Sequence, residues 1–209
     1  MRKILFIASH RKDRSPSQRF RFEQYFDFLN QNNFECHFSN LLSEEDDKVF
    51  YRTGSFSKKG LVFIKSFFKR WNDLAIAKKA DIIFVQREAF MTGSTFFEKR
   101  MSRMKKKLVF DFDDSIWILD TSLANKKWEW LKNAKKTSRI IEMSDLVFAG
   151  NQYLADYAKK FNPNVLVVPT TIDTYEYKRE VKFEPKETIC IGWSGSITTI
   201  KHFEYAIPF

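Results

Sequence analysis

Apolar and polar positions divide the chain into short strand-like runs that alternate with helical segments. Some of these runs, including residues 82–85 and 146–149, are continuously apolar, as expected for strands buried on both sides of a parallel sheet. The alternation predicts an α/β fold in which a mostly parallel sheet carries helices on both faces. The predicted strands are residues 3–8, 34–38, 82–86, 108–112, 146–149 and 165–168.

The helical segments repeat apolar side chains at the spacing of one helix face. The first helix has the clearest start, because Ser15 and Gln18 have the spacing of a capping box and Pro16 suits a first turn. We expect each apolar stripe to face the sheet. The stripes are Phe22, Tyr25, Phe26 and Leu29; Ile64, Phe67, Phe68 and Trp71; and Tyr153, Leu154, Tyr157 and Ala158.

Two stretches lack such a pattern. Residues 43–59 are expected to form an exposed loop or short helix, with a solvated acidic run at 44–47. Pro169 ends the last strand, and the polar residues after it have no helical period. The predicted organisation is therefore a domain at residues 1–168, a linker at 169–187 and, at 188–209, the first strand and partial helix of a truncated second domain.

Composition narrows the class of protein. With 209 residues, of which 44% are hydrophobic, the chain can bury one sizeable core. Its net charge of +10 favours anionic partners such as phosphates, acidic lipids or nucleic acid, and a merely solvated basic surface is the alternative. No apolar run approaches the roughly 20 residues needed to span a bilayer, and the start of the chain does not resemble a signal peptide. We therefore expect a cytoplasmic protein, and peripheral attachment to the inner face of the membrane stays open.

Cysteine and histidine spacing indicates neither a disulfide nor a metal site. Cys36 and Cys190 lie in apolar strand patterns and are expected to be small buried side chains. His10, His37 and His202 do not have the spacing of metal ligands. The first strand is not followed by G-x-G-x-x-G, which disfavours a dinucleotide enzyme. We expect no metal and no cofactor.

Candidate catalytic residues follow the predicted strands, because ligands of an open parallel sheet bind outside the carboxyl ends of its strands. His10 follows the first strand and could act as a general base. Asp113 and Asp114 follow the fourth, where crowded carboxylates raise each other's pKa and can supply a base. Asp111 and Asp113 also have the spacing of a divalent-metal motif, although an aspartate that caps the following turn explains this short match equally.

Candidate acceptor-binding residues lie at the same edge. Arg19 and Arg21 occupy the first turns of a helix, where a cation opposes the helix dipole. This placement indicates either a bound phosphate or carboxylate, or surface ion pairs with Glu23 or Asp27. The full set of acceptor-binding candidates is Arg19, Arg21, Arg87, Glu88, Trp117 and Asn151.

A glycine turn near the end of the chain has the pattern of a phosphate site. It follows a short apolar run and leads into a helical start, so unpaired backbone N–H groups would point at an anion. The candidate donor-phosphate residues are Gly192, Ser194, Gly195 and Ser196.

Five segments, at residues 15–21, 110–117, 149–154, 168–173 and 191–196, have the order and spacing of a known family. Together they resemble bacterial glycosyltransferases of the two-domain GT-B architecture, of the type grouped as families 1 and 4. The resemblance implies a cleft between two Rossmann-like domains, of which the N-terminal one holds the acceptor and the C-terminal one the nucleotide sugar, without an obligatory metal. The turn at residues 192–196 matches the loop that approaches the donor phosphates.

The resemblance further implies transfer of a sugar from a nucleotide-sugar donor to a glycan or lipid-linked acceptor in surface polysaccharide synthesis. Because the rest of a donor domain is absent after Phe209, we expect the chain alone to be inactive. The alternative function is a non-catalytic module that binds an anionic ligand or a glycan. No nucleic-acid partner is expected, because the sequence carries no nucleic-acid-binding motif.

Overall fold

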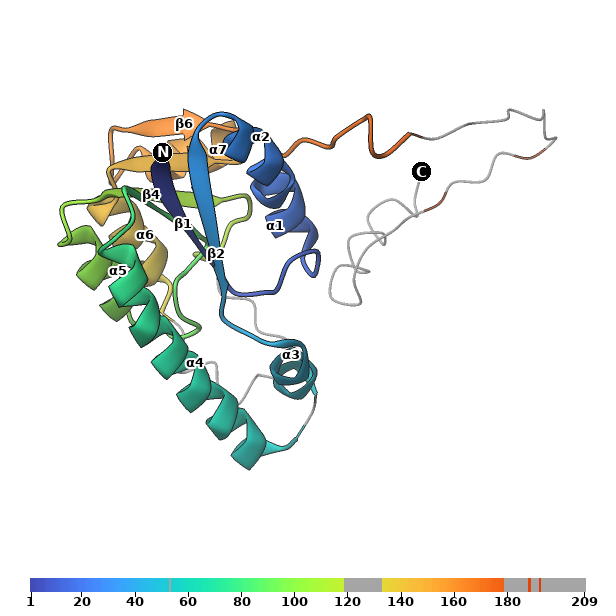
Figure 1. Cartoon of the computed structure of the whole chain (residues 1–209), viewed down its shortest axis with the longest axis vertical. Coiled ribbons are helices and arrows are strands. Elements are labelled where there is room, and N and C mark those ends of the chain that lie inside the picture. Colours follow the sequence, from blue (N-terminus) through green and yellow to red (C-terminus); the bar gives the residue numbers. More distant parts are fainter. Residues whose placement is uncertain (53, 119–132, 179–187, 189–191, 193–209) are drawn as a thin grey trace. The chain divides into compact units, whose positions relative to one another are not determined.

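The computed structural model describes residues 1–52, 54–118, 133–178, 188 and 192 (Figure 1). The chain divides into two compact units, Met1–Ile172 and Asp173–Phe209, and all the helices and strands described belong to the first. Domain boundaries at residues 168 and 187 remain predictions. Cys190, Ser194, Gly195, Ser196 and His202 lie outside the described residues.

The first unit is built on a six-stranded sheet in the order β2-β1-β3-β4-β5-β6. Every neighbouring pair of strands is parallel, which confirms the predicted α/β, Rossmann-like fold. Each strand ends within two residues of its predicted bounds. The strands are β1 (Arg2–Ala8), β2 (Phe34–Asn40), β3 (Ile82–Gln86), β4 (Lys107–Phe112), β5 (Leu146–Ala149) and β6 (Val165–Val167).

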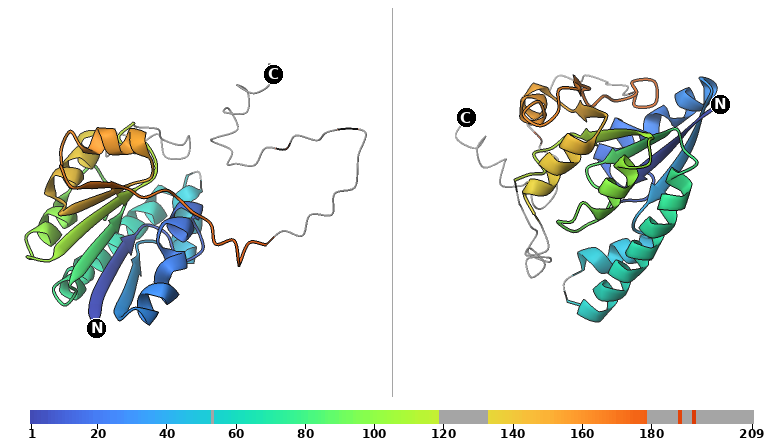
Figure 2. Two further views of the ribbon diagram at one scale, coloured as in Figure 1. Left: turned by 90° about the horizontal axis from the view of Figure 1, so that it is seen from above. Right: turned by 90° about the vertical axis from the view of Figure 1, so that its left-hand side faces the viewer.

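Helices cover both faces of the sheet, as predicted (Figures 1 and 2). On one face the core side chains of the strands pack against α4 to α7, and on the other they pack against α2 and against Phe22, which follows α1. The helical elements are α1 (Pro16–Arg21), the 3-10 turn η1 (Glu23–Tyr25), α2 (Phe26–Gln31), α3 (Glu44–Tyr51), α4 (Phe56–Ala77), α5 (Phe96–Ser102), α6 (Lys135–Met143) and α7 (Gln152–Ala158).

The first helical segment buries only part of its apolar stripe, because Phe26 and Leu29 are partly buried and Tyr25 is exposed. It also does not start as predicted. Phe22 is buried, and its ring stacks at 5.3 Å on that of Phe6 in β1. The Ser15 side chain makes no capping hydrogen bond, and the segment breaks at Phe22 into α1, η1 and α2. The capping-box prediction was wrong because the Gln18 side chain is hydrogen-bonded to the loop after β1 instead.

Helix α4 turns its predicted core stripe outward. Ile64, Phe68 and Trp71 are exposed, and within that stripe Phe67 packs against the core. The buried face carries Arg70 and other polar side chains between its apolar residues. The prediction was wrong because buried acceptors at the strand ends bind Arg70, as described below. No helix in the described ranges is both long and apolar enough to cross a membrane.

Candidate functional site

The order of the sheet reverses between β1 and β3. The chain leaves β1 toward β2 on one side, and β3 lies on the other side, so the loops that follow β1 and β3 diverge at their carboxyl ends. Such a switch point opens a crevice in which ligands of this fold class bind. His10 follows β1, and Arg87 and Glu88 follow β3, so the fold brings these three candidates to the switch point.

The backbone of His10 is fixed by Gln18 of α1. The His10 N–H donates to Gln18 Oε1 at 2.8 Å, and Gln18 Nε2 donates to the His10 carbonyl oxygen at 2.9 Å. Gln18 Nε2 also lies 3.0 Å from Glu23 Oε1. Because Gln18 is buried, this paired contact holds the loop after β1 in one conformation.

The imidazole of His10 lies between Asp47 and Tyr51 of α3. Nδ1 is 3.4 Å from Asp47 Oδ1, and Nε2 is 3.4 Å from the Tyr51 hydroxyl oxygen. Within the described part of the chain, Nδ1 and Asp47 Oδ1 are buried and make no hydrogen bond of normal geometry. Arg14 Nε donates to Asp47 Oδ2 at 2.8 Å, and Arg11 lies 3.6 Å from the same oxygen. A carboxylate held by two arginines thus faces the ring of the candidate base.

Burial lowers the pKa of His10 below its ordinary value of 6.5, with Asp47 opposing this shift and the Arg14 charge adding to it. Arg87 lowers the same pKa, so its charge reaches across the switch point. His10 is therefore neutral near pH 7, so one ring nitrogen carries a lone pair that can accept a proton, as a general base requires.

Arg21 is buried and bound to the ends of two strands. Its Nε lies 3.2 Å from Asp111 Oδ2, and its terminal nitrogens contact Asp111 Oδ1 and the Val168 carbonyl oxygen. Burial raises the pKa of Asp111 to about 6, and Arg21 opposes the shift. Both side chains are closed off from solvent, so they join β4 to the segment after β6 rather than face a ligand.

Arg19 is partly exposed and lies beside Asp13. Its guanidinium donates to the Asp13 carbonyl oxygen at 2.6 Å and lies 3.4 Å from the Asp13 carboxylate. Glu23 instead accepts a hydrogen bond from the Asp13 N–H at 2.8 Å. The two arginines therefore form ion pairs, although with Asp13 and Asp111 and not with the Glu23 or Asp27 partners expected.

Arg87 meets the carboxylates that follow β4. Its backbone is left-handed, with φ of 62°, and its guanidinium lies 3.1 Å from Asp113 and 3.6 Å from Asp114. Asp114 is largely exposed, whereas Asp113 packs over Gly150. A Cβ on Gly150 would lie 3.0 Å from Asp113 Cα, so the glycine permits Asp113 to approach the end of β5.

Two buried cations hold the loop after β3 in place. Lys136 of α6 donates to Glu88 at 2.7 Å and to the carbonyl oxygen of Thr92 at 2.7 Å. Arg70 of α4 donates to the carbonyl oxygens of Ala89 at 2.7 Å and of Ala8 at 3.0 Å. Because Ala8 ends β1 and Ala89 follows β3, Arg70 links the two sides of the switch point.

The remaining candidates have local structural contacts. Asn151 caps α7 by accepting the Leu154 N–H at 2.9 Å. Trp117 stacks on Tyr157, with ring centroids 3.7 Å apart. Gly192 is exposed and is the one donor-phosphate candidate among the described residues. No three His, Cys, Asp or Glu side chains of the described ranges gather as metal ligands would, and the absence of a metal stays a prediction.

Several residues of this site were not predicted from the sequence. Asp47 and Tyr51 belong to a stretch interpreted as solvated, although Tyr51 follows Asp47 at i+4 and so shares its helix face. Arg70 and Asp73, at i and i+3, form an ion pair at 2.7 Å on the buried face of α4. The sequence did carry a signal for that pair, because polar residues recur on the face of α4 opposite its aromatic residues.

Comparison with known proteins identifies no family for this chain. No family model matches the chain, and no curated protein matches it. One solved structure to which it is similar is an alpha-glucosyltransferase in complex with UDP-glucose and DNA containing an abasic site, with 12% identity and a TM-score of 0.38 over 78% of this chain. The chain spans 41% of the length of that structure. Similarity at this level does not assign a function.

Proposed function

We propose that the first unit is the acceptor-binding domain of a GT-B glycosyltransferase. The enzyme would transfer a sugar from a nucleotide-sugar donor to a glycan or lipid-linked acceptor in surface polysaccharide synthesis. The observation that carries the proposal is a neutral, partly buried histidine beside a carboxylate at the switch point of a parallel sheet. The five sequence segments that resemble this family support the same assignment.

In the proposed reaction His10 is the general base. Asp47 lies beside Nδ1 and stabilises the imidazolium that forms when Nε2 accepts the proton of the acceptor hydroxyl. The hydroxyl oxygen forms a bond to the anomeric carbon of the donor, the bond from that carbon to the phosphate oxygen breaks, and the nucleoside diphosphate leaves. Tyr51, 3.4 Å from Nε2, lies where the acceptor hydroxyl would approach.

Acceptor binding is assigned to the charged groups around His10. Arg87, Glu88 and Asp114 are partly or largely exposed and can donate to or accept from sugar hydroxyls. Asp113 fixes Arg87, so we assign it to positioning. We assign Asn151 and Trp117 to the shape of the neighbouring edge of the acceptor site. Binding of the donor phosphates is assigned to residues 192–196.

Binding of glycans to the 209-residue chain tests the acceptor assignment. An array of bacterial surface glycans is probed with the wild type, with Arg87→Ala, and with Lys107→Ala as the matched control. Lys107 is an exposed cation at the amino end of β4, far along the strand from the switch point. We expect retention of at least one glycan by the wild type and the control, and its loss in Arg87→Ala. Retention of none, or equal retention by all three proteins, would contradict the assignment.

A product assay separates the enzyme from the non-catalytic alternative. The full product of the reading frame is incubated with a panel of nucleotide sugars and the glycan found on the array. We expect release of nucleoside diphosphate and a lengthened glycan, with a rate about 100-fold or more lower in His10→Gln, as loss of a general base predicts. Glycan binding without any transfer would support the binding module instead.

A further inference from the structure

The outer face of α4 carries an apolar stripe that no other described part of the domain covers. Leu61, Ile64, Phe68 and Trp71 are 63%, 53%, 62% and 44% exposed. Their spacing of three, four and three residues places them on one side of a helix. We call these four residues the α4 stripe. A row of large apolar side chains that faces solvent marks an interaction surface more often than isolated exposed residues do.

Helix α5 widens the stripe along one side. Phe96 of α5 is exposed and stacks against Trp71, with ring centroids 6.1 Å apart and planes 18° from parallel. The Arg100 guanidinium lies 5.1 Å from the Trp71 ring and 4.6 Å from the Phe96 ring. The apolar surface thus ends at a cation on this side.

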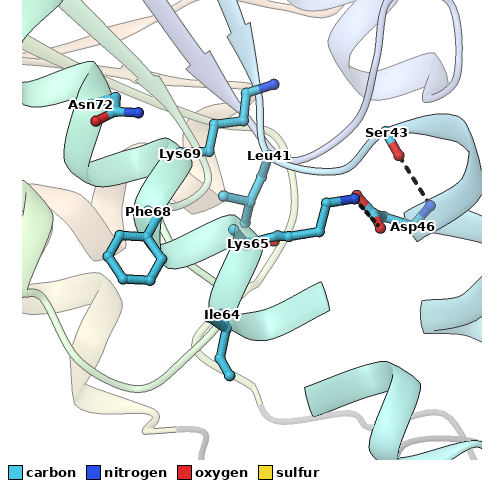
Figure 3. Close-up of a pocket in the computed structure, with 9 residues that line it drawn as sticks. Leu41, Ser43, Asp46, Ile64, Lys65, Phe68, Lys69 and Asn72 are labelled. Carbon is cyan, nitrogen blue, oxygen red and sulfur yellow. Dashed lines mark hydrogen bonds and ion pairs between the residues drawn. The ribbon is translucent and has the colours of Figure 1, made fainter. Parts of the chain in front are cut away.

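Lysines border the stripe along its other side. Lys58, Lys65 and Lys69 of α4 are exposed. They are spaced seven and four residues apart, which places them together on the side of the helix next to the apolar residues. Lys65 is bound to Asp46 of α3 at 3.0 Å. In Figure 3 it reaches toward that carboxylate, while Ile64 and Phe68 point away from it. A hollow of about 500 Å³ lies on this lysine side, between α4 and the start of α3.

The charges near the stripe are mostly positive. On α4 itself Asp73 is buried and paired with Arg70, so it does not offset the exposed lysines. On α3, Asp46 is paired with Lys65 and Glu44 with Lys48, while Glu45 accepts from Ser43 at the start of that helix. Lys58, Lys69 and Arg100 therefore give the stripe a basic border.

We propose that the α4 stripe docks this domain on an anionic membrane surface. A helix that buries a narrow apolar strip at the acyl boundary and keeps lysines at the headgroups has this arrangement. Trp71 suits the same depth, because its ring is apolar and its indole N–H can bind at the interface. A second copy of this chain fits less well, because a two-fold contact through this face would oppose two sets of like charges.

The proposal goes beyond the transfer reaction and stands whether or not the switch point transfers sugar. Helix α3, which carries Asp47 and Tyr51 beside His10, packs next to α4 (Figure 1). Docking through α4 would therefore bring the candidate base close to a lipid surface, where a lipid-linked acceptor would be presented.

Vesicle flotation of the 209-residue chain tests the proposal. The probes are vesicles of phosphatidylcholine alone and of phosphatidylcholine and phosphatidylglycerol in equal parts. We expect binding to the anionic vesicles that weakens as salt is raised. Leu61→Ser with Phe68→Ser should lower the partition coefficient about tenfold or more, and Lys58→Gln with Lys69→Gln about tenfold with a weaker salt dependence.

Phe28→Ser is the matched control, because Phe28 is 61% exposed on α2, which packs on the opposite face of the sheet. It should bind vesicles as the wild type does. Circular dichroism checks that each variant is folded. Failure of the wild type to float with anionic vesicles, or equal flotation of the wild type and the serine variant of the stripe, would overturn the proposal. Concentration-dependent dimerisation that the stripe variant abolishes, without vesicle binding, would assign the surface to a second copy instead.

Discussion

The first helical segment and α4 carry the same kind of apolar spacing but use it in opposite ways. Phe22 of the first segment is buried in the core, whereas Phe68 of α4 is exposed to solvent. The difference arises on the other face of α4, where Arg70 and Asp73 find partners at the strand ends. Helical periodicity identifies a stripe of like side chains, and the partners available in the fold decide which stripe is buried.

Removal of Arg70 should have the largest effect on this arrangement. Arg70→Met removes the side-chain donor to the Ala89 carbonyl group and one of two donors to that of Ala8, and it leaves Asp73 as a buried, uncompensated charge. We expect the free energy of unfolding to fall by about 3–5 kcal/mol, measured by urea denaturation. Lys69→Met, at the neighbouring exposed position, should change it by no more than about 0.5 kcal/mol. Similar losses in both variants would show that Arg70 is not the anchor of α4.

Truncation of one phenylalanine in each helical stripe compares them directly. Phe22→Ala creates a cavity in the aromatic cluster with Phe6 and Phe84, and should cost about 3–5 kcal/mol of unfolding free energy. Phe68→Ala removes an exposed ring and should cost less than about 1 kcal/mol. Thermal and urea unfolding of both variants measure the difference. If Phe68→Ala cost about as much unfolding free energy as Phe22→Ala, then α4 would bury Phe68 instead of exposing it.

Two glycines, Gly150 after β5 and Gly60 in α4, should change the free energy of unfolding with opposite signs. Gly150→Ala forces a Cβ to within 3.0 Å of the Asp113 backbone and should destabilise the fold by about 1–3 kcal/mol. Gly60 lies in α4, where an added Cβ would meet no neighbouring group within 4 Å, so Gly60→Ala should stabilise by about 0.5–1 kcal/mol. Urea denaturation of the two variants measures both changes. Stabilisation by both substitutions would mean that Asp113 does not pack on Gly150.

The sheet could be predicted from the sequence because its strands carry their own signal. Continuous apolar runs such as those of β3 and β5 have few other interpretations when helical segments separate them. The carboxyl-end rule then placed His10, Arg87 and Glu88 at one edge without any knowledge of side-chain contacts. The strand order, which the sequence did not predict, shows in addition that these residues flank the switch point.

Partners distant in sequence could not be predicted in the same way. Arg21 and Asp111 are 90 residues apart, and nothing local distinguishes their buried contact from a surface ion pair. Asp47 belongs to an acidic run that is usually solvated, and only the packing of α3 beside the β1 loop shows that it faces His10. Gln18 has capping-box spacing, but its amide binds the His10 backbone instead.

The most direct test of the account is the pH titration of the His10 ring by NMR in the wild type and in Asp47→Asn. We expect a pKa below 6.5 in the wild type, because burial disfavours the imidazolium, and a still lower pKa in Asp47→Asn, because the carboxylate that favours it is gone. His10 then contributes stability above pH 6.5 that is lost as the pH falls through the folded pKa. A His10 pKa at or above 6.5, or one that does not change in Asp47→Asn, would contradict the assignment of a neutral base poised by Asp47 at the switch point.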